Sequence, residues 1–253
     1  MQLRLAHEQF LQGAEKQSLF VYDNYFAEKQ LRFNTFTWGN GEYKLLITHG
    51  WGSKAADFLE LITALIPIKD IQIIAFDAPG NGSSEGELSN LILYELAIKA
   101  IISNYGPPDI IIGHSLGAMA NIIAVMETHI MPLLMISITP LVKLKENFAA
   151  SMDAVNIPPV SQSIFFEAFK SKFGVPASNF DLDNFYELNP EIEHWLFYDP
   201  NDIISPYAYL KEFLNNQKLI TAKNYDGLGH DKIIRSPIVI NAVVDLINST
   251  LKN

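Results

Sequence analysis

The chain has 253 residues, 49% of them hydrophobic, and this length suits one large domain, or a core domain with a small insertion. Its formal net charge of −10, without any cluster of lysine and arginine, argues against nucleic acid as a partner. Because the sequence contains no cysteine, it excludes disulfides, thiolate metal ligands and a catalytic thiol, and its chemistry must come from oxygen and nitrogen groups.

The first 35 residues contain no motif that points to chemistry. Leu3, Phe10 and Leu11 have the spacing of an amphipathic helix, which more often packs on the protein or forms a dimer contact than anchors it to a membrane. The N-terminus meets a charge within eight residues and lacks the apolar stretch of a secretory signal, so we expect a cytoplasmic protein without a membrane partner. We expect a monomer or a homodimer.

Short apolar runs rich in β-branched residues then alternate with longer amphipathic stretches. This alternation is typical of strands and crossover helices in a mostly parallel sheet. Buried strands are predicted at residues 44–48, 71–76, 109–112 and 133–138. Helices are predicted at residues 55–66, 89–104 and 116–127. The longest uncharged stretch, residues 110–126, is interrupted by polar residues and glycines, so it predicts a buried strand and helix and not a membrane span.

The alternation stops after residue 140. From 141 to 190 the apolar residues are largely aromatic and have helical spacing, with prolines between them. This predicts a helical cap at 141–190, inserted into an α/β core formed by residues 1–140 and 191–253. Its aromatic side chains either line a binding pocket or form the core of the cap itself: Phe148, Phe165, Phe166, Phe169, Phe173, Phe180, Phe185 and Tyr186. After the cap, strands are predicted at 195–198 and 219–222 and helices at 207–215 and 237–251.

Residues 113–117, with the sequence G-H-S-L-G, fit the pattern G-x-S-x-G, in which a sharp turn from strand to helix presents a serine hydroxyl. The letters alone are weak evidence, because residues 82–86 match them as well. Ser115 directly follows a buried apolar run and opens a helix, whereas Ser84 lies in a stretch rich in Gly, Ser and Asn. We therefore predict Ser115 as a nucleophile, with a helix N-cap as the alternative role.

A serine hydroxyl becomes an effective nucleophile when a histidine takes its proton and an acid fixes the tautomer of that histidine. His230 is predicted as the base, because it follows the last strand in a loop with two glycines at the carboxyl edge of the sheet. Asp202, past another strand at the same edge, is predicted as the orienting acid, and Asp199 is the alternative acid or a cap of the turn. The other histidines lack a comparable setting: His7, His49, His114, His129 and His194.

Acyl transfer also needs backbone N–H donors for the negatively charged oxygen that develops on the substrate. One donor of this oxyanion hole is expected at Leu116, directly after the nucleophile. The second candidate is the N–H of Trp51, because residues 48–53 follow a predicted strand and contain glycines that let the backbone turn inward. A glycine-rich turn in which Trp51 only packs is the alternative.

Four ordered motifs resemble the α/β-hydrolase family: residues 49–52, 113–117, 199–202 and 229–230. The likeness covers residues 36–250 and is nearest to poorly characterised bacterial members with a serine nucleophile. It implies an eight-stranded, mostly parallel sheet with a helical cap after the sixth strand, and it places the acid at Asp202. Residues 76–84 look like a structural loop of the family, with Asn81 where many members carry histidine.

The resulting hypothesis is a serine hydrolase that cleaves an ester or thioester through an acyl-enzyme and needs no cofactor or metal. Its partner is a small, partly apolar molecule. A serine nucleophile disfavours the dehalogenases and epoxide hydrolases of this fold, which use a carboxylate in its place. Carbon–carbon bond hydrolysis and cofactor-free lyase chemistry remain alternatives, as does a non-catalytic ligand-binding or sensor role.

Overall fold

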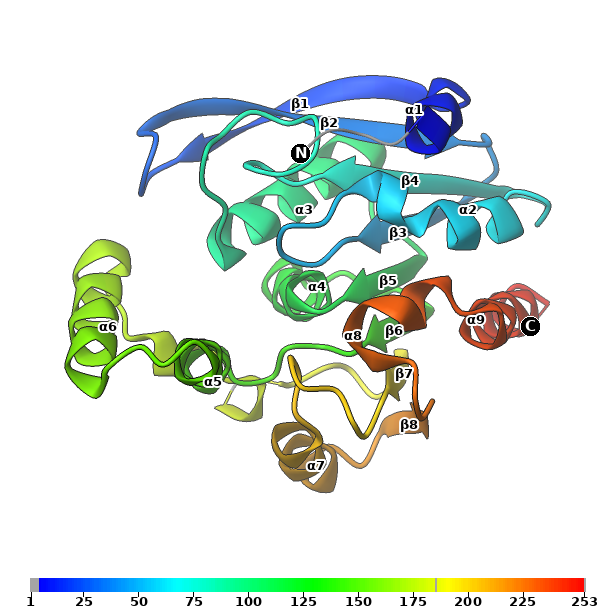
Figure 1. Ribbon diagram of the computed structural model, residues 1–253. Coiled ribbons are helices and arrows are strands. Elements are labelled where there is room, and N and C mark those ends of the chain that lie inside the picture. Colours follow the sequence, from blue (N-terminus) through cyan, green and yellow to red (C-terminus); the bar gives the residue numbers. More distant parts are fainter. Residues whose placement is uncertain (1–4, 185, 253) are drawn as a thin grey trace.

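The computed structural model describes residues 5–184 and 186–252, and an eight-stranded sheet runs through this part of the chain (Figure 1). Its strands are β1 Glu15–Asp23, β2 Lys29–Trp38, β3 Tyr43–Thr48, β4 Ile71–Asp77, β5 Ile110–His114, β6 Leu134–Ile138, β7 Glu193–Tyr198 and β8 Ile220–Asn224. They lie in the order β1-β2-β4-β3-β5-β6-β7-β8. β2 pairs antiparallel with β1 and β4, and the remaining neighbours are parallel.

This mostly parallel sheet confirms the fold expected from the sequence. Strands β3 to β8 lie where strands were predicted, with ends that differ by at most two residues. The hairpin of β1 and β2 was not predicted. Much of β1 is exposed, and β2 buries Asn34, Thr35 and Thr37, so neither strand has the continuous apolar run by which the others were found.

Helices cover both faces of the sheet. In Figure 1, α3 (Leu91–Tyr105) and α4 (Leu116–Thr128) lie on one face, and α2 (Leu59–Leu65) and α9 (Pro237–Thr250) lie on the other. Each face has its own cluster of buried apolar side chains, as a parallel sheet buried on both sides requires. Among the described residues, no single helix is long and apolar enough to cross a membrane; α9 meets that test only together with Gly229–Arg235, from which it is bent by 55°.

The N-terminal helix α1 (Leu5–Gln12) packs near the edge of the sheet. The ring of Phe10 stacks on Trp38 of β2, with centroids 5.0 Å apart. Phe10 and Leu11 both contact the apolar cluster on the α2 and α9 face. The predicted amphipathic helix is therefore present and packs within the chain, while Leu3 lies outside the described residues.

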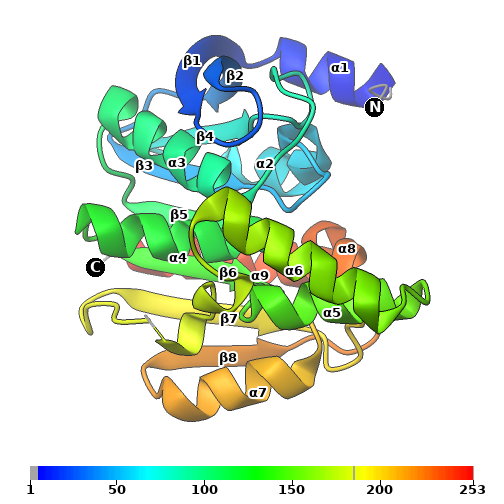
Figure 2. The same ribbon diagram turned by 90° about the vertical axis from the view of Figure 1, so that its left-hand side faces the viewer.

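Two helices lie between β6 and β7, in the segment where an insertion was expected. They are α5 (Leu144–Ala154) and α6 (Pro159–Phe173), followed by short 3-10 turns at Ala177–Asn179 and Leu182–Asn184. α6 stands apart from the sheet in Figure 1, and the view from that side in Figure 2 shows it crossing in front of the sheet. Phe185 lies outside the described residues.

A buried histidine makes the stability of this fold depend on pH. His194 of β7 is hydrogen-bonded to Ser137 Oγ through Nε2 (2.8 Å) and to the Tyr186 hydroxyl through Nδ1 (2.6 Å). Burial lowers the pKa of His194 from 6.5 to about 3. The unfolded chain therefore binds a proton below pH 6.5 that the folded chain does not. The stability that results is complete above pH 6.5 and is lost as the pH falls toward 3.

We expect His194 alone to lower the free energy of unfolding by about 2 kcal/mol between pH 6.5 and 5. Urea unfolding of His194→Asn should show a correspondingly weaker pH dependence, even though the lost hydrogen bonds lower its stability at every pH. His129→Asn is the matched control, because His129 is exposed and should not alter the pH dependence. An unchanged pH dependence in His194→Asn would contradict this explanation.

Candidate active site

Ser115 occupies a sharp turn between β5 and α4. Its backbone φ of 54° and ψ of −124° form a conformation that few residues other than glycine adopt. A Cβ at Gly117 would lie 2.3 Å from the His49 carbonyl oxygen, and a Cβ at Gly113 would lie 2.5 Å from the Cα of Ala118. The two glycines of the motif therefore allow the close backbone approach that this turn needs.

The Ser115 hydroxyl faces a histidine from the C-terminal part of the chain. Its Oγ lies 2.9 Å from Nε2 of His230, which follows β8 in the short helix α8 (Gly229–Lys232). Although Ser115 is the N-cap residue of α4, its side chain makes no capping hydrogen bond to the described residues. The structure thus brings the predicted nucleophile and base together and does not support the N-cap alternative.

A carboxylate holds the other side of the His230 ring. Asp202 Oδ2 lies 2.7 Å from Nδ1. Asp202 Oδ1 accepts hydrogen bonds from the N–H groups of Ile204 and Ser205, at 2.8 and 3.0 Å. Because an ionised carboxylate only accepts, Nδ1 carries the ring hydrogen and Nε2 is free to accept the proton of Ser115. The Asp202 side chain is only 1% exposed, so water hardly competes for this bond.

Asp199, the alternative acid, binds the backbone of the loop that carries His230. Its Oδ1 accepts from the N–H of Asn201 (2.8 Å) and its Oδ2 from the N–H of Gly229 (2.6 Å). Burial would raise the pKa of Asp199, but these and neighbouring backbone N–H groups outweigh it and lower the pKa below its ordinary value. The geometry therefore gives Asp199 the task of joining two loops and leaves Asp202 facing the imidazole.

His114 is a buried residue whose role the sequence did not reveal. Its Nε2 lies 2.9 Å from the carbonyl oxygen of His230, and the two ring centroids are 4.8 Å apart. Burial and the neighbouring His230 lower the pKa of His114 to about 3. The ring is therefore neutral, and its Nε2–H donates to the His230 carbonyl. Only its place beside Ser115 hinted at this support, because the bonded partner lies far away in the sequence.

The N–H groups of Leu116 and Trp51 are the expected oxyanion donors. Leu116 begins α4, and the first N–H groups of a helix have no partner within the helix. In the described part of the chain, no hydrogen bond uses the N–H of Trp51, which lies in the turn after β3. Gly50 brings that turn against the nucleophile, since a Cβ there would lie 3.0 Å from Ser115 Cβ. Both donors therefore remain candidates on the geometry.

Asn81 links this turn to the start of α3. Its Oδ1 accepts from the N–H of Gly52 (3.1 Å), and its Nδ2 donates to Ser89 Oγ (2.9 Å). The sequence singled out Asn81 only as a departure from the histidine common in the resembled family. The structure shows that the amide supports the turn that contains Trp51.

The second G-x-S-x-G match has a structural role. Ser84 Oγ donates to the carbonyl oxygen of Asp77 (2.5 Å) and accepts from the N–H of Asn34 (2.9 Å). These bonds tie the loop after β4 to β2. This agrees with the interpretation of that loop as structural.

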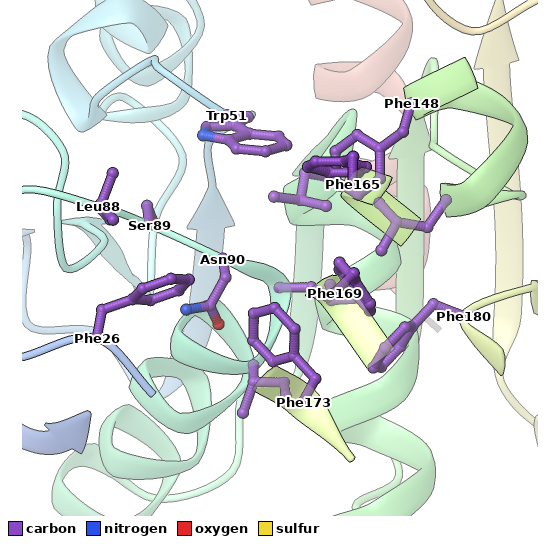
Figure 3. A pocket seen from close by; sticks show the side chains of 14 residues that line it. Phe26, Trp51, Leu88, Ser89, Asn90, Phe148, Phe165, Phe169, Phe173 and Phe180 are labelled. Atoms are coloured by element: carbon purple, nitrogen blue, oxygen red, sulfur yellow. The ribbon is translucent and has the colours of Figure 1, made fainter. Parts of the chain in front are cut away.

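An apolar chamber of about 210 Å³ lies beside Leu116 and Trp51 (Figure 3). Its lining includes six phenylalanines: Phe26, Phe148, Phe165, Phe169, Phe173 and Phe180. In Figure 3 the Trp51 ring lies at one end, with Phe26 and Phe173 toward the other. The Trp51 ring meets Phe148 edge to face, with centroids 5.6 Å apart. Aromatic residues of the 141–190 segment therefore pack on one another and also line a cavity that reaches Leu116, the residue after Ser115. We call this cavity the phenylalanine chamber.

One group of side chains has the composition of a metal site. Ligand atoms of His114, His230 and Asp231 lie within 4.8 Å of one another. Both ring nitrogens of His230 are already hydrogen-bonded to Ser115 and Asp202, however, and His114 Nε2 is bonded to a carbonyl oxygen. This arrangement fits a hydrogen-bonded catalytic site better than a metal centre.

Comparison with known protein families gives a match to the alpha/beta hydrolase family over residues 45–233, which include Ser115, Asp202 and His230. No curated protein matches the sequence.

Solved structures match over nearly the whole chain. An esterase from Pyrococcus furiosus has 17% identity and a TM-score of 0.67, over 100% of this chain and 95% of that one. A thermophilic esterase from Thermogutta terrifontis has 13% identity and a TM-score of 0.64, over 92% and 99%. Alpha/beta hydrolase domain-containing protein 10 from mouse has 15% identity and a TM-score of 0.68, over 93% and 98%. At these identities the likeness concerns the fold alone.

Proposed function

The chain belongs to the alpha/beta hydrolase family, and on that basis we propose that it is a serine hydrolase that cleaves an ester or thioester bond in a small molecule. In this proposal Ser115 is the nucleophile, His230 the general base and Asp202 the orienting acid. The observation that carries it is the row of hydrogen bonds from Ser115 Oγ through both ring nitrogens of His230 to Asp202, at 2.9 and 2.7 Å. A serine with no catalytic task does not need this arrangement.

The first half of the reaction acylates the enzyme. Ser115 Oγ attacks the carbonyl carbon of the substrate and its proton passes to Nε2 of His230. Asp202 stabilises the imidazolium that forms. The N–H groups of Leu116 and Trp51 donate to the carbonyl oxygen as it becomes negative. When the intermediate collapses, the bond to the leaving group breaks and that group takes the proton from His230.

The second half releases the acid. A water molecule gives a proton to His230 Nε2 and attacks the acyl carbon, and the proton returns to Ser115 Oγ as the ester bond to the enzyme breaks. Every proton in this cycle moves through one imidazole nitrogen. The support of the His230 loop by Asp199 and His114 fits this demand, because the ring must keep its position through both halves.

We also propose that residues 141–190 form a cap over this site. Its helices contribute Phe148, Phe165, Phe169 and Phe173 to the phenylalanine chamber. A segment that covers an apolar pocket can exclude water while the acyl-enzyme forms.

A fluorophosphonate probe should label the folded chain at Ser115, because it reacts with a serine whose proton a neighbouring base removes. Peptide mass spectrometry locates the adduct. His230→Gln is the matched control, and it should abolish labelling while Ser115 remains in place. Failure to label Ser115 in the folded chain would favour a ligand-binding or sensor role. Labelling of Ser115 without turnover of any ester or thioester would favour carbon–carbon bond hydrolysis or lyase chemistry.

A further inference from the structure

We propose that the phenylalanine chamber selects substrates whose acyl group is a plain hydrocarbon of about eight carbons, with the leaving group held in a polar chamber that Trp51 also lines. This inference rests on the proposed serine hydrolase function and adds to it the chemical class and size of the substrate. Three features of the described residues carry it: the polar atoms at the chamber wall, the chamber volume, and the position of His230.

Apart from the Trp51 indole N–H and the hydroxyl hydrogen of Ser89, the side-chain polar atoms at the chamber wall have other partners or are covered by protein. Ser89 Oγ accepts a hydrogen bond from Asn81, and Asn90 Oδ1 accepts from the N–H of Leu93 at the start of α3. Asn90 Nδ2 makes no hydrogen bond within the described residues, but protein atoms cover it, so it cannot meet a ligand as the structure stands. A hydroxyl or carboxylate on the acyl chain would therefore give up its water for at most the two donors of Trp51 and Ser89. The chamber suits an acyl group without oxygen atoms.

The volume of the chamber sets a limit on the chain. A cavity of roughly 150 Å³ lined by apolar side chains holds one benzene molecule of six carbons. In proportion, the phenylalanine chamber at about 210 Å³ holds about eight carbons. A shorter acyl group leaves part of the chamber empty, and a longer one gains no further burial there unless it displaces a phenylalanine. The expected acyl groups are a straight chain of about eight carbons or a phenyl ring on a short linker.

The position of His230 decides which part of the substrate enters. The leaving atom takes its proton from His230 Nε2, so the leaving group has to lie near the 229–235 segment. A separate polar chamber of about 480 Å³ lies on that side, and its lining includes Trp51, His114, Asp231 and Arg235. By contrast, the lining of the phenylalanine chamber comes only from residues between 26 and 180. Trp51 lines both chambers, so in this proposal the acyl group occupies the phenylalanine chamber and the leaving group the polar one, with Trp51 shared between them.

The test measures kcat/KM of the full chain for p-nitrophenyl esters of straight-chain acids from two to sixteen carbons. Each CH₂ that the chamber buries should raise kcat/KM by up to about fourfold, with no further rise beyond about eight carbons, which is the preferred length. An eight-carbon acyl group that ends in a carboxylate should be hydrolysed at least tenfold more slowly than its unmodified equivalent. The rate at which alkyl fluorophosphonates of the same lengths label Ser115 gives an independent readout.

Phe169→Ala tests the chamber directly. Phe169 lies at the centre of the aromatic cluster, with its ring centroid 4.5 Å from that of Phe173 and 6.2 Å from that of Phe180. Removing its ring should move the preferred acyl length upward by about two to four carbons. Phe166→Ala is the matched control on the same helix, because Phe166 does not line the chamber, and it should leave the preferred length unchanged.

The outcomes separate this inference from the function on which it rests. Ser115-dependent hydrolysis with the same kcat/KM at all lengths would overturn the inference and leave the serine hydrolase intact. A preferred length that Phe169→Ala does not shift, or that Phe166→Ala shifts equally, would also overturn it. If no ester is hydrolysed and no fluorophosphonate labels Ser115, the proposed function itself is wrong and this inference is wrong with it.

Discussion

Ser115→Ala is expected to lower turnover by about 10⁴-fold or more while the chain stays folded. The substitution removes the only atom that can form the acyl-enzyme in the proposed mechanism. The base and the orienting acid stay in place, since Asp202 holds the His230 ring from the side away from Ser115. The oxyanion donors and substrate binding can still support a small residual rate. The turnover of the variant can therefore stay above the rate of uncatalysed hydrolysis in water.

The sequence supplies a matched control for this variant. Ser84→Ala changes the serine of the other G-x-S-x-G match, whose Oγ is hydrogen-bonded to Asp77 and Asn34. It should lower stability by about 1 to 2 kcal/mol and leave kcat close to that of the original chain. Ester hydrolysis measured on both variants, with thermal unfolding to confirm the fold, distinguishes the two motifs. Full activity in Ser115→Ala would falsify the assignment of the nucleophile.

Asp202→Asn is expected to lower kcat by about 10⁴-fold with little change in the fold. Asparagine has nearly the same shape, but it carries no charge to stabilise the imidazolium of His230. If its amide N–H faces Nδ1, it also favours the tautomer whose hydrogen lies on Nε2, and that tautomer cannot accept the proton of Ser115. The Oδ1 position can still accept the N–H groups of Ile204 and Ser205, which preserves the loop.

Asp199→Asn is the comparison that tests the choice between the two acids. Asp199 binds the N–H groups of Asn201 and Gly229, and an asparagine oxygen can keep one of these bonds. The kcat of Asp199→Asn should therefore fall by no more than about tenfold, because the loss of a single hydrogen bond costs about 1 kcal/mol. Pre-steady-state acylation rates and kcat for both variants provide the measurement. A larger loss in Asp199→Asn than in Asp202→Asn would exchange the roles of the two carboxylates.

Much of the fold could be predicted from the sequence, because the central strands are buried on both faces. Ile110, Ile111 and Ile112 of β5 form a continuous apolar run that only a fully covered strand needs. β1 and β2 were missed because β1 is largely exposed and β2 contains buried polar residues, so neither presents such a run. Phe10 also shows the limit of periodicity, which predicted a helix but not its stacking on Trp38.

The candidate active site also has a part that local sequence pattern predicts and a part that it does not. The strand, the glycines and the start of α4 are neighbours in the sequence, so the turn at Ser115 could be predicted from local pattern. His230 lies 115 residues further along the chain, and only its loop setting and order pointed to it. The bonded partners of His114 and Asn81 could not be predicted from local pattern, because hydrogen bonds between distant segments depend on how the whole sheet brings its loop edges together.

The sequence by itself therefore determined the type of fold and the serine that it presents, since both follow from apolar runs, glycines and turns within a few residues of one another. Tertiary structure decided which aspartate faces the imidazole, why Ser84 is structural and which described phenylalanines of the 141–190 segment line the chamber. These depend on distances between side chains from separate loops and helices. Such distances are set by packing over the whole molecule, which a local pattern does not contain.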